Sequence, residues 1–431
     1  MNATAKYALV TFVIALALRL ILLGVTLPKL RPDLDLDYYR SLGRSLAAGR
    51  GFVAPSDDGR ELPNVARTPT YPVFLACLIR IGGDRLALFL SVQCLLGALT
   101  AGLTVVLAAR WLRPAISLLA GLLVAVDPNS VMRCADLRTE TLFTLLLVSG
   151  ACLAAWWPGR KSSWFATGLL WSLAALARPI GLWIWVPTAV VIGMCLVSWK
   201  DRALCLAAFL VGFLPLLGLW AARNYARTGC RFVSSISVGN LLLYRAAGVE
   251  AQIEGRQLKD VQRDYRARYG DLEYVEDPSR FQQSLAACKR AAIVKLCQSP
   301  VVLAEQNVLG WGKLLFGPAV RALGNSLSQS EPPSGTLAAP QRGPAGSSLN
   351  QSESPSRWWA PLYSLALLAV TFLSVVGARR LKSESILLVV LILYFVALAG
   401  GPGSNSRFRV PVTPMLAVLA VAGLCGPEKK R

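Results

Sequence analysis

The stretch DLDYYRSLGRSLAAGRGF, residues 35–52, follows directly after the first long apolar run of the chain. Apolar and small side chains from Tyr39 to Leu46 recur at the three-and-four spacing of one helix face, and Gly49 and Gly51 end the pattern. The stretch therefore predicts a short amphipathic helix that lies at a membrane surface.

The composition around this stretch is that of a membrane protein. Of the 431 residues, 54% are hydrophobic and only 16% are charged, and the mean hydropathy is +0.50. These values lie outside the normal range of soluble globular proteins. A helix needs about 20 apolar residues to cross a membrane, and about ten runs approach that length, so we expect an all-α polytopic protein. The expected spans are residues 6–27, 86–109, 114–126, 141–157, 164–177, 180–199, 203–222, 358–378, 385–399 and 411–424.

The polar segments divide the chain into four parts. They are an N-terminal transmembrane module (1–222) that contains a long loop (28–84), an extramembrane region (223–323), a flexible insert rich in Ser, Pro, Gly and Ala (324–357) and C-terminal transmembrane helices (358–431). We expect surface helices in the loop 28–84. We expect a small mixed structure in 223–323, with a β-like run at 231–239 and an interfacial helix at 300–318.

The basic residues orient the chain in the membrane. Lys and Arg collect near 110–113, 160–161, 200–202, 379–382 and 429–431. The positive-inside rule predicts that these loops and both termini are cytoplasmic. The loop 28–84 and the region 223–323 are then expected on the outer, periplasmic side of the cytoplasmic (inner) membrane. The run 7–27 is too long for a signal-peptide core and lacks a cleavage site, so we expect it to be retained.

Charge and composition also exclude several classes of function. A net charge of +21 would suggest nucleic acid in a soluble protein, but basic loops and anionic membrane lipids explain it here, so no nucleic-acid partner is expected. The absence of histidine excludes His-based acid–base chemistry and most zinc or copper sites. The cysteines show no metal-binding spacing. Four cysteines are expected on the outer side, so a disulfide between two of them is compatible with the sequence. They are Cys134, Cys230, Cys288 and Cys297.

Arginines in the short outer loops work against the insertion rule and need compensation. Recognition of phosphate by their planar guanidinium groups is one explanation. Reaching to lipid headgroups, or pairing with Glu140 and Asp127, is the other, and the convergence of several arginines favours phosphate. These arginines are Arg133, Arg138, Arg178, Arg407 and Arg409.

Asp35 and Asp37 are the candidate catalytic acids. Taken alone, an Asp-x-Asp at a helix start is more often a helix cap or a solvated pair than a catalyst, and Glu140 equally suits the start of its own helix. The combination of motifs changes this interpretation. In chain order the motifs are Asp35 with Tyr39, GRGF (49–52), RTPTYPVFLA (67–76), DP (127–128), LRTETLF (137–143), ALARPIGL (175–182), RNYARTG (223–229) and SRFRVPVTP (406–414).

In this order the motifs resemble those of the GT-C superfamily of glycosyltransferases, closest to the protein O-mannosyltransferase and ArnT-like aminoarabinose transferase group. The resemblance covers nearly the whole chain apart from the insert. It implies a GT-C fold, in which surface helices of the first outer loop cover the active site. It also implies transfer of a hexosyl or pentosyl group from a polyprenyl-phosphate donor, with inversion, to an unknown glycan, lipid or protein acceptor.

By position, the resemblance makes Asp35 the first-loop acid and Arg67 the basic residue that contacts the donor phosphate. Leu36 stands where many relatives have a second acid, and Tyr38 where the ArnT-like group has a basic residue. The general base therefore stays open between Asp35 and Asp37, with Asp35 favoured. The expected donor-phosphate and substrate residues are Tyr39, Arg67, Arg133, Arg138, Glu140, Arg223, Arg407 and Arg409.

This chemistry needs few groups. A polyprenyl phosphate is already a competent leaving group, cations stabilise its developing charge, and a carboxylate takes the proton of the acceptor as it attacks. No cofactor is required, and a divalent cation held by carboxylates is compatible with the sequence. A transporter or flippase of lipid-linked saccharides is the alternative, although no internal repeat is visible. A noncatalytic membrane scaffold is a third hypothesis.

Overall fold

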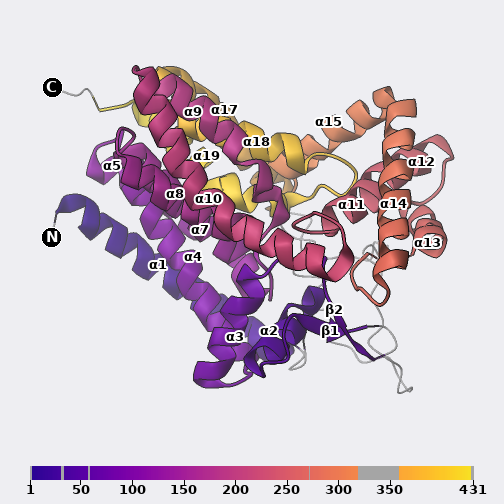
Figure 1. Cartoon of the computed structure of the whole chain (residues 1–431). Coiled ribbons are helices and arrows are strands. Elements are labelled where there is room, and N and C mark those ends of the chain that lie inside the picture. The colour runs from indigo at the N-terminus through magenta and orange to yellow at the C-terminus, as the bar shows by residue number, and fades with distance from the viewer. Residues whose placement is uncertain (1, 31–33, 57–58, 271, 319–358, 429–431) are drawn as a thin grey trace.

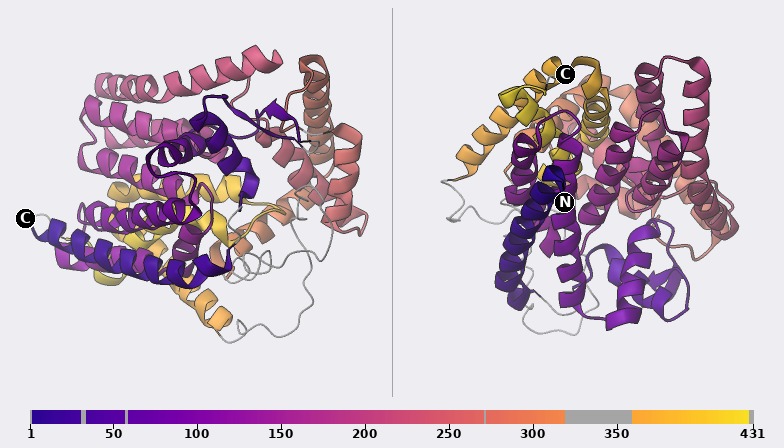
Figure 2. Two further views of the ribbon diagram at one scale, coloured as in Figure 1. Left: turned by 90° about the horizontal axis from the view of Figure 1, so that it is seen from below. Right: turned by 90° about the vertical axis from the view of Figure 1, so that its left-hand side faces the viewer.

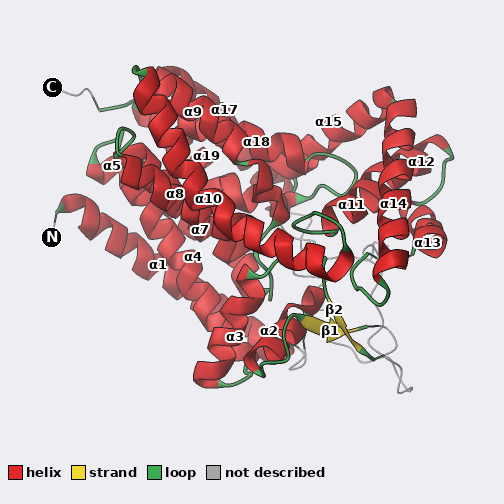
Figure 3. Ribbon diagram, in the orientation of Figure 1, coloured by secondary structure: helices red, strands yellow, loops and turns green. Residues whose placement is uncertain are grey.

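The computed structural model describes residues 2–30, 34–56, 59–270, 272–318 and 359–428, so the expected insert at 324–357 lies outside the described residues. Helices dominate the described chain (Figure 3). Each of the ten stretches expected to span a membrane contains a helix. The helices are α1 (Ala3–Thr26), α4 (Leu86–Ala108), α5 (Pro114–Val126), α7 (Glu140–Trp156), α8 (Lys161–Ala175), α9 (Trp185–Cys195), α10 (Trp199–Thr228), α17 (Trp359–Leu381), α18 (Ile386–Ala399) and α19 (Thr413–Cys425).

The long apolar helices make the chain a multi-pass membrane protein. By length and composition, five helical stretches of the described residues can cross a membrane, or six if the bent pair Pro114–Val126 and Pro128–Ala135 forms one span. The expected number of about ten spans is therefore not reached by this criterion. The shorter apolar helices are Thr70–Gly82, Glu140–Trp156 and Pro179–Cys195.

One of these stretches, Ala360–Ala399, contains two helices. Its 40 residues would extend over about 60 Å as one straight helix, and the 17 residues of α15 (Pro300–Phe316) over about 25 Å. Both ends of the stretch nevertheless lie next to α15, which is much shorter than the stretch would be if it were straight. The Ser364 hydroxyl donates to Phe316 O (2.8 Å), and Arg245 joins Leu398 O to Asn307 of α15. The stretch therefore folds back between α17 and α18.

Glycines let two helix pairs of the bundle pack closely. A Cβ atom on Gly168 or Gly212 would clash with a backbone carbonyl across the α8–α10 contact, and one on Gly377 or Gly423 would do so across the α17–α19 contact. Small residues at such contacts are typical of membrane helices, where van der Waals packing replaces the hydrophobic effect. The bundle is also joined by Arg19 of α1, which is buried and donates to the last carbonyls of α5.

The polar segments gather at one end of the bundle. Figure 1 shows β1, β2 and the helices α11 to α14 at the end opposite the start of α1 and the end of α19, and Figure 2 agrees. The first loop contains α2 (Tyr39–Ala47), β1 (Val53–Pro55), β2 (Glu61–Pro63) and α3 (Thr70–Gly82), and the later region contains α11 (Ile236–Asn240), α12 (Ala247–Ile253), α13 (Leu258–Tyr269), α14 (Pro278–Gln298) and α15. The surface helices expected in the loop 28–84 thus have counterparts in α2 and α3.

The β-like run expected at 231–239 is wrong. Residues 231–235 form an irregular link, residues 236–239 belong to α11, and the only strands among the described residues are β1 and β2, which pair antiparallel. The serine hydroxyls of the run satisfy neighbouring backbone: Ser234 donates to Ala66 O and Ser235 to Leu272 O (2.5 Å). Two serines of the alternating pattern therefore bind the link to the first loop and to the loop that contains Leu272.

The first loop and the later region are joined directly. Val65 N donates to Glu273 O (3.0 Å) and Val275 N donates to Pro63 O (3.1 Å), with Asn64 and Tyr274 forming a bridge. Segments more than 200 residues apart in sequence thereby share one small backbone ladder. All ten cysteines are free, so the disulfide considered from the sequence does not form here.

Candidate active site

The two candidate acids lie in an unusual turn before α2. Asp37 and Tyr38 have φ values of 64° and 61°, in the left-handed region. Asp tolerates this conformation, but two successive non-glycine residues in it are rare and strained. The turn gives Asp35 and Asp37 different surroundings.

Asp35 caps the start of α2. Its carboxylate accepts hydrogen bonds from the backbone N–H groups of Arg40 (2.7 Å) and Ser41 (2.8 Å), and from the Ser41 hydroxyl (2.5 Å). Burial raises the pKa of Asp35 more than these hydrogen bonds lower it. Asp35 thus has the geometry of a helix cap, the first of the alternatives considered from the sequence.

Asp37 faces two arginines, one from later in the first loop and one from the segment just before α7. One oxygen lies 3.3 Å from Nη2 of Arg67, and the other lies 3.8 Å from Nη1 of Arg138. The Asp37 side chain keeps 39% of its surface exposed, so the carboxylate stays reachable. Burial would raise its pKa, but the charges of Arg67, Arg138 and Arg407 outweigh burial and hold the pKa below the ordinary value. Asp37 is therefore ionised and accessible.

Arg67 is held from several sides. Its guanidinium lies over the ring of Tyr39, 5.5 Å from the centroid, and 3.8 Å from a carboxylate oxygen of Glu273. Tyr39 in turn packs edge-on against Tyr71 at 5.1 Å. Despite its burial, the Arg67 side chain stays charged, because Asp37 leads the groups that raise its pKa against the effect of burial. Tyr39 and Arg67, both expected at the site, therefore meet Asp37.

A second ion-pair group lies at the start of α7. Glu140 is buried, and one of its oxygens lies 2.8 Å from Arg178 and 3.9 Å from Arg407, while the other accepts no hydrogen bond. Arg178 also lies over the rings of Phe143 and Phe408. The charge of Arg407 also lowers the pKa of Asp37, so the ion pairs around Glu140 and those around Asp37 interact electrostatically.

Three of the expected site residues have other partners. Arg133 pairs with Asp136, three residues along the chain. The other two donate hydrogen bonds to backbone carbonyls. Arg409 donates to Leu314 O, Leu315 O and Gly317 O at the end of α15. Arg223 donates to Phe52 O and Asn64 O in the first loop. These contacts support the packing of helices and loops.

Sequence reasoning did not select Arg178 or Glu273 for the site. Arg178 is one of the arginines expected in the outer loops, and the available signal is its position between an expected span and a proline, with an acid expected in a neighbouring outer loop. Glu273 carries no local signal, because only the ladder with residues 63–65 brings it to Arg67.

The central cluster can bind an anion and accept a proton. We define it by four arginines, Arg67, Arg138, Arg178 and Arg407, and three carboxylates, Asp37, Glu140 and Glu273. The Nε atoms of Arg67, Arg138 and Arg407 are buried and donate no hydrogen bond, so part of the hydrogen-bonding capacity of these arginines is unused within the protein. Among the described residues, no group of three or more His, Cys, Asp or Glu side chains is arranged to hold a metal ion.

No protein-family model matches this sequence, and no curated protein is significantly similar to it. Among solved structures, the Archaeoglobus fulgidus oligosaccharyltransferase in the apo form aligns with a TM-score of 0.57 and 13% identity, over 97% of this chain and 50% of that chain. The A. fulgidus oligosaccharyltransferase AglB in complex with an inhibitory peptide and a dolichol-phosphate aligns with a TM-score of 0.52 and 15% identity, over 96% of this chain and 50% of that chain.

ArnT from Cupriavidus metallidurans bound to undecaprenyl phosphate aligns with a TM-score of 0.40 and 16% identity, over 95% of this chain and 77% of that chain. The chain spans about half the length of the oligosaccharyltransferase, and over that half it has a similar fold. Oligosaccharyltransferase AglB is a GT-C glycosyltransferase, so the GT-C fold predicted from the motifs is confirmed.

Proposed function

We propose that this GT-C-fold chain is a membrane glycosyltransferase that moves a sugar from a polyprenyl-phosphate donor to an acceptor at the outer face of the membrane. The observation that carries the proposal is the ionised, reachable Asp37 carboxylate among the arginines of the central cluster. The A. fulgidus AglB complex contains a dolichol-phosphate, a lipid phosphate of the class proposed here as donor.

In the proposed reaction, Asp37 is the general base. The acceptor oxygen or nitrogen attacks the anomeric carbon from the face opposite the phosphate and passes its proton to Asp37. The bond between the anomeric carbon and the phosphate oxygen breaks, and its electron pair leaves with the polyprenyl phosphate. Attack from the opposite face inverts the anomeric configuration.

Arginines of the central cluster take the phosphate. Three of them, Arg67, Arg138 and Arg407, have buried Nε donors without a protein acceptor. The fourth, Arg178, pairs with Glu140, which also lies near Arg407. Their fixed charges stabilise the negative charge that develops on the leaving phosphate. This proposal excludes Arg133 and Arg409 from phosphate binding, because Asp136 and the end of α15 occupy their guanidinium groups.

The assignment of the base moves from Asp35 to Asp37. Three hydrogen bonds at the start of α2 already occupy the Asp35 carboxylate, and accepting a proton there would weaken the cap. Asp37 has no such task and faces the arginines that would bind the donor.

We further propose the topology expected from the basic loops. About ten helices cross the cytoplasmic membrane, both termini are cytoplasmic, and the central cluster lies on the outer side. The N-terminal module with its catalytic loop, the extracytoplasmic region and the C-terminal helices would then surround one site. The positions of the polar segments at one end of the bundle support this orientation (Figure 1).

A donor panel tests the function. Membranes that contain the protein are incubated with radiolabelled polyprenyl-phosphate sugars, and the label is followed into lipid, glycan and protein fractions. We expect one donor to transfer label covalently to an acceptor. A flippase would instead move intact donor across the membrane and leave its sugar–phosphate bond unbroken, and that outcome would contradict the proposal.

A further inference from the structure

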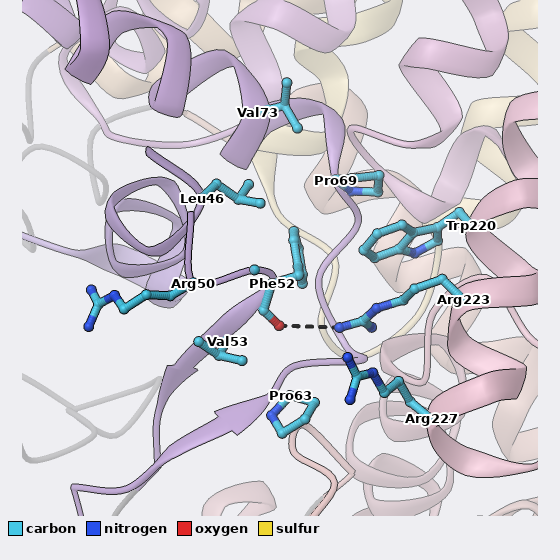
Figure 4. A pocket seen from close by; sticks show the side chains of 11 residues that line it. Leu46, Arg50, Phe52, Val53, Pro63, Pro69, Val73, Trp220, Arg223 and Arg227 are labelled. Atoms are coloured by element: carbon cyan, nitrogen blue, oxygen red, sulfur yellow. Dashed lines mark hydrogen bonds between the residues drawn. The ribbon is translucent and has the colours of Figure 1, made fainter. Parts of the chain in front are cut away.

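A cavity lies next to the first outer loop, and none of the residues that line it belongs to the central cluster. It has a volume of about 330 Å³ and lies between the β1–β2 hairpin, the start of α3 and the C-terminal end of α10. We name it the hairpin pocket (Figure 4). The residues that line it include the apolar Phe52, Val73 and Trp220 and three arginines. Figure 4 shows the guanidinium groups of Arg223 and Arg227 close together, whereas that of Arg50 points away from them.

The charge of the hairpin pocket is not balanced. Arg50 pairs with Glu61 at 2.5 Å, but the acceptors of Arg223 are neutral groups, including Phe52 O at 3.2 Å and Asn64 O at 2.8 Å. Within the described part of the chain, Arg227 makes no ion pair, and its side chain is exposed. Two arginines one helical turn apart therefore leave positive charge in the hairpin pocket, which is suited to an anion.

The surroundings of the hairpin pocket are apolar and exposed. Val73 in its wall is 46% exposed, and Leu219, beside Trp220 and one turn before Arg223, is 69% exposed. These side chains belong to α3 and to α10, which is one of the helices long and apolar enough to cross a membrane. Exposed apolar groups, a Trp and arginines at the end of such a helix are typical of the membrane–water interface.

We propose that the hairpin pocket binds an anionic phospholipid of the surrounding membrane. Its phosphate would contact Arg227, with the positive charge of Arg223 one turn away, and the part of its acyl chain nearest the headgroup would lie against Val73 and Trp220. Arg223 then serves this pocket and the hairpin, rather than the donor phosphate. The proposal is independent of the glycosyl transfer proposed above, because none of these side chains pairs with the acids of the central cluster.

Native mass spectrometry of the purified full chain tests this assignment. Detergent-solubilised protein is titrated with phosphatidylglycerol and, separately, with phosphatidylcholine. The test variant is Arg227→Gln. The matched control is Arg290→Gln, which changes another exposed arginine on α14, outside the hairpin pocket.

We expect phosphatidylglycerol to bind more tightly than phosphatidylcholine. Arg227→Gln should weaken phosphatidylglycerol binding about tenfold, the effect of losing one charged hydrogen bond, while Arg290→Gln should leave it unchanged. Equal loss in both variants, or no loss in Arg227→Gln, would overturn the proposal. A thermal melt of each variant in the same detergent confirms that the compared proteins are folded.

A further arm separates a lipid from free phosphate. Inorganic phosphate is added as a competitor, and Val73→Gln removes apolar surface without changing charge. A lipid site predicts weak competition by inorganic phosphate and reduced phosphatidylglycerol binding in Val73→Gln. Full displacement by phosphate at similar concentration, with normal binding by Val73→Gln, would mean a simple anion site and would overturn the lipid assignment.

Discussion

Two carboxylates separated by one residue in the first loop have different surroundings. Asp35 accepts hydrogen bonds at the start of α2, whereas Asp37 points to Arg67 and Arg138. The left-handed turn at Asp37 and Tyr38 separates them. Spacing alone could not distinguish the two acids, because no residue of the motif signals that turn. The same limit applies to Arg409, because its acceptors are distant backbone carbonyls at the end of α15.

Replacing Arg67 should change the pH dependence of transfer. Arg67 is the first of the groups that lower the pKa of Asp37 against burial, so Arg67→Gln should raise that pKa. A base must be ionised, and the acid limb of the rate profile should therefore move to higher pH. The pH profile of kcat measures this shift.

The control for Arg67→Gln is Arg263→Gln, an exposed arginine on α13 that pairs with Asp260. Its acid limb should coincide with that of the unmodified protein. An acid limb in Arg67→Gln that stays in place or moves to lower pH would show that Asp37 is not the titrating base.

Replacing Asp35 should affect stability more than chemistry. Asp35→Ala removes the side-chain acceptor of two backbone N–H groups at the start of α2, and the loss of such a cap costs about 1 kcal/mol. We expect a lower melting temperature in detergent and a smaller loss of transfer per folded molecule than Asp37→Asn causes. Unchanged melting together with complete loss of transfer would return the catalytic role to Asp35.

At the scale of elements, glycines set how closely helices approach. A Cβ on Gly377 of α17 would overlap Leu419 O of α19, whereas a Cβ on Gly218 of α10 would meet no atom within 4 Å. Gly377→Ala should therefore separate α17 from α19 and destabilise the protein by about 1–3 kcal/mol. Gly218→Ala should be neutral or slightly stabilising, because alanine favours helix. Melting temperatures of the two variants check this, and equal values would contradict the close α17–α19 packing.

The helices could be predicted because long apolar runs are strong signals. The expected ranges 86–109 and 114–126, for example, differ from α4 and α5 by at most one residue at an end. The three-residue strands β1 and β2 are too short to show an alternating pattern. The run at 231–239 shows such a pattern without forming a strand, because Ser234 and Ser235 bond to separate loops.

In the whole molecule, the polar segments lie at the end of the bundle opposite the start of α1 and the end of α19 (Figure 1). Residues of the central cluster come from loops spread over most of the chain, from Asp37 to Arg407. The motifs predicted several of these residues, since each motif follows or precedes a span. The contact with Glu273 depends on the tertiary ladder between the first loop and the later region, which no local pattern reveals.

Two natural cysteines can test the orientation of the chain. Cys297 on α14 and Cys425 at the end of α19 are both exposed, and the proposed topology assigns them to opposite sides of the membrane. In variants that keep one of the two and have serine at the other cysteines, a membrane-impermeant maleimide should label Cys297 in intact cells. Cys425 should react only after the membrane is opened. Labelling of both from outside would contradict the topology.

The most direct measurement of the central claim compares Asp37→Asn with the unmodified protein under single-turnover conditions with a radiolabelled polyprenyl-phosphate sugar. Because asparagine cannot accept the acceptor's proton, the rate of transfer should fall at least about 100-fold, while the Kd for the donor changes little. Asp37→Asn protein that transfers sugar at the normal rate would contradict the assignment of Asp37 as the base.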